Sequence, residues 1–180
     1  MGPRRLRFLD LDRRHLGLTS GIANGYSEAA RVCLDRHHVS PVSFRLSDND
    51  RTKKVKADWL KADKRTTEAW ANKDDATEAG AYALSLAAIE LMRGLVAVRR
   101  AETLTGADYY LGRPGAHAGD LEAALRLEVS GTDEGSETVM KARLRLKKEQ
   151  TRQGNSNLPA VASVVGFAAL RILTEDVEGT

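Results

Sequence analysis

Two acid-bearing segments decide the fold: Gly106-Ala107-Asp108-Tyr109-Tyr110-Leu111 and Leu125-Arg126-Leu127-Glu128-Val129-Ser130. Each alternates apolar and polar residues, and successive side chains of a strand point to opposite faces. The alternation therefore predicts two strands, with Asp108 on the polar face of the first and Glu128 on the polar face of the second. If the strands pair, the two carboxyls approach each other. Hard divalent cations are held by such oxygen ligands.

The size of the chain predicts one domain. It has 180 residues, 42% of them hydrophobic and 29% charged, and domains commonly hold about 100–200 residues. The only cysteine, Cys33, has no partner in the chain for a disulfide, so a reducing cytoplasm is the expected location. Its helical context indicates a buried structural thiol rather than a nucleophile.

The charge pattern is compatible with a polyanionic partner, although many metabolic enzymes are equally basic, and the lack of a long uncharged apolar run excludes a membrane span. The formal charge is +3, and Lys and Arg gather in the N-terminal segment, in residues 51–65 and in residues 141–152. Clusters of this kind matter more than the sum. The most apolar region, residues 79–98, is interrupted by Glu90 and Arg93, whereas a span needs about 20 largely apolar residues. No apolar signal segment follows the basic N-terminus.

The first half of the chain is predicted to be mainly helical. Thr19-Ser20 is a helix N-cap ahead of residues 22–37, and residues 42–46 alternate as a short strand. Residues 51–65 are expected to form a short amphipathic helix or a loop. Residues 66–102 are predicted to be helical, with Gly80 dividing them and a buried central second half.

The second half is predicted to hold most of the sheet. The two acid-bearing strands are joined by a glycine-rich loop, and Ser136 caps a helix that runs to residue 153. Residues 160–167 read as a buried strand, followed by a short strand or a tail. The expected fold is a single mixed α/β domain, residues 1–180, with a small sheet flanked by helices. Its expected parts are a basic arm (1–18), a core (19–167) and a C-terminal tail (168–180).

This order of elements, with a Gly-x-Asp strand and a later acid-bearing strand, resembles the PD-(D/E)xK (restriction-endonuclease-like) nuclease superfamily. The resemblance spans residues 20–167 and implies a restriction-endonuclease-like core that hydrolyses DNA. It implies that Asp108 and Glu128 bind Mg²⁺ (or Mn²⁺) and act in catalysis. The first core helix of the family often adds a glutamate, which implies Glu28 as a third metal ligand.

The sequence departs from the family motif at one position. Ser130 stands where the superfamily has its lysine, and serine carries no positive charge. Some members relocate this cation to the following helix, where Lys141 is the expected replacement because it is nearest the helix start. The same basic helix implies DNA contacts by Lys147, Lys148 and Arg152.

Three alternatives stay open. Acids on the polar face of a strand are commonly just solvated. The loss of the motif lysine also fits an inactive, nuclease-like subunit that binds nucleic acid or serves as a scaffold. The small size fits a protein-interaction domain of the immunity or antitoxin kind. A homodimer and a place in a larger complex are both compatible with the sequence.

Overall fold

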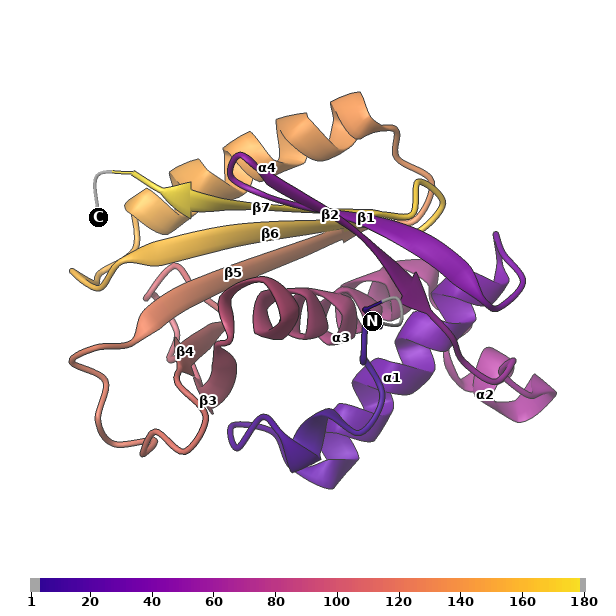
Figure 1. Ribbon diagram of the computed structural model, residues 1–180, viewed down its shortest axis with the longest axis horizontal. Helices are drawn as coiled ribbons and strands as arrows, with labels where there is room; N and C mark the ends of the chain where they lie inside the picture. The colour runs from indigo at the N-terminus through magenta and orange to yellow at the C-terminus, as the bar shows by residue number, and fades with distance from the viewer. Residues whose placement is uncertain (1–3, 179–180) are drawn as a thin grey trace.

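Seven strands form one mixed sheet in the order β2-β1-β7-β6-β5-β4-β3 (Figure 1). The computed structural model describes residues 4–178. The strands are β1 (Val42–Asp48), β2 (Arg51–Ala57), β3 (Val96–Arg100), β4 (Tyr109–Gly112), β5 (Leu125–Thr132), β6 (Ala160–Gly166) and β7 (Arg171–Val177). The helices are η1 (Leu11–Arg13), α1 (Ser20–Asp35), α2 (Lys64–Ala69), α3 (Lys73–Arg93) and α4 (Glu137–Arg152). A mixed α/β fold with helices flanking a sheet is therefore confirmed.

Two parallel pairs join antiparallel hairpins within this sheet. β5 pairs in parallel with β6, and β7 pairs in parallel with β1, whereas the other neighbours are antiparallel. All seven residues of β6 are buried, as expected for a central strand covered on both faces. Beyond β2, the N-terminal segment adds a short parallel contact, in which Leu6 N donates to Lys56 O at 2.8 Å and Lys56 N donates to Arg4 O at 3.0 Å.

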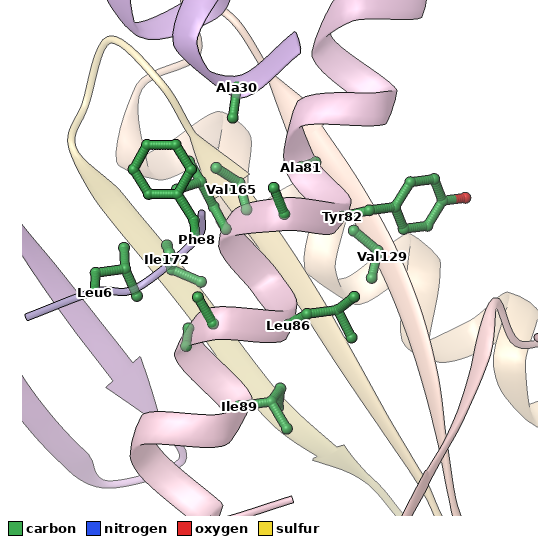
Figure 2. Packing of buried hydrophobic residues seen from close by; sticks show 14 of the residues in the cluster. Leu6, Phe8, Ala30, Ala81, Tyr82, Leu86, Ile89, Val129, Val165 and Ile172 are labelled. Carbon is green, nitrogen blue, oxygen red and sulfur yellow. The ribbon is translucent and has the colours of Figure 1, made fainter. Parts of the chain in front are cut away.

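The main core lies between the sheet and the helices α1 and α3. Figure 2 shows α3 in front of the strands, with Leu86 and Tyr82 beside Val129 of β5 and with Phe8 near Val165 and Ile172. Leu127 and Val129 face this core, which confirms the apolar face predicted from the alternation. Cys33 is buried there, and burial raises the pKa of its thiol to about 11.

The opposite face of the sheet is covered by α4. Met140 and Leu144 of this helix pack on Ala162, Val164 and Leu173, and the helix lies over β5, β6 and β7 (Figure 1). Its first turn is capped by Ser136, whose Oγ accepts from Val139 N at 3.4 Å, and Thr19 caps α1 in the same way. Both caps were predicted from the sequence.

Three segments differ from the sequence prediction. Residues 51–57 form β2 instead of a helix or loop, because they pair antiparallel with β1 and bury only Val55 and Ala57 on one face. The predicted helix over residues 66–102 is interrupted at residues 70–72 and ends at Gly94, whose φ of 69° is the left-handed C-cap conformation. Residues 96–100 then form β3.

The two ends of the chain also contribute to the fold. The C-terminal segment, predicted to be a short strand or a tail, contains β7, which pairs with both β6 and β1. The predicted basic arm buries Leu6, Phe8, Leu11 and Leu18 in the main core. Residues 1–3 and 179–180 of these two segments lie outside the described part of the chain. Among residues 4–178, the helices are all too short or too polar for a membrane span.

Gly80 brings α3 against α1 and does not divide the helix. A Cβ at Gly80 would lie 2.9 Å from the Ala30 Cα and backbone N, closer than real contacts allow. A Cβ at Gly25 of α1 would meet nothing nearer than 3.9 Å. The two helical glycines therefore differ only in the space around them.

We expect Gly80→Ala to lower the free energy of unfolding by about 1–3 kcal/mol, since the added methyl forces the two helices apart. Gly25→Ala is the matched control and should raise it by about 0.5–1 kcal/mol through helix propensity alone. Urea unfolding followed by circular dichroism measures both. An equal effect of the two substitutions would contradict the close approach at Gly80.

Candidate functional site

The site lies at the start of β4, where β5 continues past it. β4 pairs with β5 from Leu125 to Leu127, so residues 128–132 of β5 extend beyond it. A cavity of about 590 Å³ opens there between α3 and α4. We call it the cleft; its lining residues are Lys73, Asp74, Thr77, Glu78, Tyr82, Asp108, residues 128–133, Arg143 and Lys147.

Hydrogen bonds to both of its carboxylate oxygens fix Asp108 in the lining of the cleft. Its Oδ2 accepts from Val129 N at 2.8 Å, and its Oδ1 accepts from the Tyr82 hydroxyl at 2.8 Å. Arg100 Nη2 lies 3.4 Å from the same Oδ1. The backbone N of Asp108 donates to Leu127 O at 2.7 Å, which carries the strand contact one residue beyond β4.

Glu128 stands beside Asp108 and is paired with a lysine of α4. Lys147 Nζ lies 2.6 Å from Glu128 Oε1. Burial and the nearby charge of Asp108 raise the pKa of Glu128, and Lys147 offsets only part of this effect. The structure thus brings the two predicted acids together. The positive charge beside them is too small to compensate both negative charges fully.

A tyrosine cluster supports Asp108 from the side of α3. Tyr82 stacks on Tyr26 with a centroid separation of 4.9 Å and meets Tyr109 edge-on at 5.8 Å. The Arg100 guanidinium lies 4.8 Å from the Tyr82 ring centroid and 4.7 Å from that of Tyr109. Burial and the charge of Asp108 raise the pKa of Tyr82, so its hydroxyl stays protonated and acts as a donor.

The far end of the cleft is built around a second acid, Asp133. Its Oδ1 lies 3.1 Å from His37 Nε2 and 3.4 Å from Arg36 Nη1, and its Oδ2 lies 3.1 Å from Lys73 Nζ. Burial alone would raise the pKa of Asp133, but the bonds from Lys73 and His37 lower it below the usual range. This carboxylate is therefore ionised and already paired.

The lining of the cleft carries more acids than bases. It has five acids (Asp74, Glu78, Asp108, Glu128 and Asp133) and three bases (Lys73, Arg143 and Lys147), a difference of two negative charges. Asp108 and Glu128 are the pair whose mutual repulsion a cation would relieve. Residues 4–178 contain no group of three His, Cys, Asp or Glu side chains placed to hold a metal together. Mg²⁺ often binds through one or two carboxylates and retains its waters.

Glu28, the third ligand expected from the family resemblance, is not brought into the cleft. It lies on α1, where its Oε2 accepts from Trp70 Nε1 at 3.4 Å. The glutamate that lines the cleft is Glu78 of α3. Glu28 lies outside the cleft because the helix that covers this part of the sheet is α3, not the first helix of the chain.

Lys141, the expected replacement for the motif lysine, also lies elsewhere. Its Nζ pairs with Glu137 at 2.9 Å, and 64% of its side chain is exposed. With 3.6 residues per turn, Lys141 and Lys147 project from different sides of the helix, whereas Arg143 and Lys147 share one. Arg143 Nη1 donates to Ser130 Oγ at 3.4 Å. Two α4 cations thus reach the strand face that carries Glu128 and Ser130.

The residues expected to contact DNA all have partners within the protein. Lys147 pairs with Glu128, and Lys148 pairs with Glu175 at 2.8 Å. Arg152 donates to Glu178 O at 2.9 Å and lies 3.2 Å from Glu149. The basic helix is therefore partly neutralised, and only Lys147 of the three lines the cleft.

Sequence reasoning missed Tyr82, Arg100 and Arg143. Tyr82 was visible as a residue with a polar tip on an otherwise apolar buried helix, a combination that calls for a hydrogen-bond partner. Arg100 was hidden because β3 was taken for helix. Arg143 was hidden because the sequence does not show which side of α4 faces the sheet, and only that orientation distinguishes Arg143 from the other basic residues of the helix.

Comparison with known protein families, curated proteins and solved structures finds no match. A function for the cleft must therefore be inferred from its geometry and chemistry alone.

We expect Tyr82→Phe to lower the free energy of unfolding by about 1–3 kcal/mol, because a hydrogen bond to a charged acceptor is lost. In an Asp108→Ala background, Tyr82→Phe should lower the free energy of unfolding by a smaller amount. The difference between the two losses is the coupling energy between Tyr82 and Asp108. Tyr110→Phe is the control, since its hydroxyl donates to Glu102 instead. Its cost should be the same in both backgrounds. Chemical denaturation of the six proteins measures the cycle, and equal costs for Tyr82→Phe would exclude the coupling.

The raised pKa of Glu128 gives a pH dependence of stability with a definite sign. The folded state holds this proton more tightly than the unfolded chain, whose glutamate titrates near pH 4.5. The stability linked to Glu128 is therefore fully present below that pH and is lost as pH rises through the folded pKa. We expect the unfolding free energy of Glu128→Gln, relative to wild type, to increase as pH rises above 4.5. Urea titrations at several pH values test this; a pH-independent difference would refute it.

Proposed function

We propose that the protein is a divalent-metal-dependent nuclease that hydrolyses phosphodiester bonds of DNA, with a restriction-endonuclease-like core. The observation that carries the proposal is the contact between Lys147 Nζ and Glu128 Oε1 at 2.6 Å. It supplies, from α4, a cation in the place that Ser130 leaves without one. Two acids, a nearby lysine and an open strand edge are the parts that such a site requires.

Asp108 and Glu128 would hold the metal ion. Their side chains fit this role because both line the cleft and their charges are incompletely compensated. When bound, Mg²⁺ or Mn²⁺ lowers the pKa of coordinated water and stabilises charge on the leaving oxygen. Tyr82 and Val129 N hold Asp108 in one orientation, so the site is fixed before the ion arrives.

The remaining cations of the cleft would act on the phosphate. Lys147 and Arg143 come from the same side of α4 and line the cleft beside Glu128 and Ser130. Both can donate to phosphate oxygens and stabilise the negative charge that develops during in-line attack. Because acids outnumber bases in the lining, a phosphate should enter this cleft only together with the metal ion.

A catalytically inactive, nuclease-like binding module is the second candidate. One specific observation favours it: both oxygens of Asp108 and one of Glu128 already accept from protein donors. Metal binding must then compete with those contacts. This candidate predicts the same fold and DNA association without metal-dependent cleavage.

Cleavage of labelled DNA with Mg²⁺ or Mn²⁺ tests the proposal. We expect Lys147→Ala to slow cleavage by about 10²-fold or more, the size of effect seen when one electrostatic contact to the transition state is removed. Lys141→Ala is the matched control on the same helix and should cleave at the wild-type rate. Asp108→Ala should abolish cleavage.

Isothermal calorimetry with Mn²⁺ separates the two candidates. The nuclease requires an ion that binds wild type and fails to bind Asp108→Ala, with circular dichroism showing that the variant is folded. Metal binding without cleavage would leave the inactive module, and wild-type cleavage rates in both Asp108→Ala and Lys147→Ala would place the activity outside this cleft.

A further inference from the structure

A basic surface lies on the sheet face beside α4, away from the cleft. α4 covers β5, β6 and β7, and the sheet continues beyond it through β1 and β2 (Figure 1). Phe44 and Val55 of these strands face the main core. The alternate residues, Arg45 and Lys54, therefore point to the same side of the sheet as α4.

Three cations stand in one row across adjacent strands of this face. Arg45 is the register partner of Arg171 in the parallel pair β1–β7 and of Lys54 in the antiparallel pair β1–β2. Neighbouring strands lie about 4.8 Å apart, so the row spans about 10 Å. We call Arg171, Arg45 and Lys54 the cation row. It lines a cavity of about 400 Å³ together with Ser43, Phe44, Ala169 and Leu170.

The cation row is poorly compensated within the protein. Glu137 pairs with Arg171 and also with Lys141. In the described part of the chain, the side chains of Arg45 and Lys54 form no hydrogen bond or ion pair, and both residues are exposed. The buried Nε of Arg171 likewise finds no acceptor among residues 4–178. Like charges directly opposite on neighbouring strands destabilise a sheet, so this row costs stability unless an anion binds.

We propose that the cation row binds the phosphodiester backbone of a nucleic acid. Arginine presents a planar fork of donors that matches phosphate oxygens, and Ser43 adds a hydroxyl at the same cavity. A protein partner would need apolar or aromatic anchors. The exposed large apolar residues of the described chain (Leu16, Ile22, Val39, Leu60, Leu104, Val139 and Leu146) all lie outside this cavity.

The row and the cleft have complementary properties. The cleft lining is net negative and calls for a metal ion before a phosphate enters, whereas the row is positive without one. Binding at the row is therefore independent of divalent metal. The inference takes its ligand class from the proposed function, but its test does not need cleavage.

The test is binding of a fluorescent DNA duplex of random sequence in the presence of a chelator, measured by anisotropy at several salt concentrations. We expect Arg45→Ala/Lys54→Ala to weaken binding about tenfold and to lower the slope of log K against log salt by about 1–2, since each phosphate contact contributes about 0.9. The control, Lys61→Ala/Arg65→Ala, removes two exposed cations, one just before α2 and one within it, and should keep the wild-type slope.

Three results would overturn the inference. They are a wild-type affinity and slope in the row variant, an equal loss in the control variant, and competition by polyglutamate that matches DNA charge for charge. The row variant should unfold at the wild-type urea midpoint or above it, because repulsion is relieved; weaker binding with a lower midpoint would instead indicate a structural role. A wild-type protein that binds DNA through the row but never cleaves it would refute the proposed function and leave the inference standing.

Discussion

The close packing of α3 against both α1 and β5 is the contact on which the rest of the structure depends. It requires two glycines: a side chain at Gly80 would collide with Ala30, and one at Gly131 would lie 2.8 Å from Thr77 O. The approach places Tyr82 beside the start of β4, where its hydroxyl reaches Asp108. The orientation of the candidate metal ligand is thus set by α3, through Tyr82, together with the β5 backbone, through Val129 N. A change that loosens α3 would disturb the cleft without touching any acid.

Electrostatics divide the molecule into surfaces with opposite requirements. On the open edge of β5, two acids stand together and one lysine offsets them in part. On the far side of α4, three cations share one row, and a single glutamate pairs with one of them. Each arrangement is unfavourable for folding by itself. Because a sequence otherwise tends to agree with its fold, such local conflicts are the places where a function is expected.

Periodicity made part of this structure predictable and left part of it hidden. The alternation of residues 125–130 correctly placed Leu127 and Val129 in the core and Glu128 on the other face. Periodicity did not reveal β2, because this strand is mostly charged and only two of its residues are buried. It did not reveal β3 either, because this strand directly follows a helix. Spacing along the chain does not show which side of α4 meets the sheet, so it did not indicate that Lys147 pairs with Glu128 or that Lys141 lies outside the cleft. Glu28 was misplaced for the same reason: only the tertiary packing shows which helix lies over β5.

The short pairing of residues 4–6 with β2 also affects how the edge of the sheet can pair with a strand of another molecule. A sheet edge presents unpaired amide and carbonyl groups that can recruit a strand from another molecule. Here the chain covers part of its own edge, since the backbone of Lys56 both donates to and accepts from this segment. Burial of Leu6 anchors it. The opposite edge, β3, is irregular at residues 97–99 and ends in Arg99 and Arg100, features that discourage strand addition. Strand addition is therefore hindered at Lys56 of β2 by the chain's own N-terminal segment, and at β3 by its irregular register.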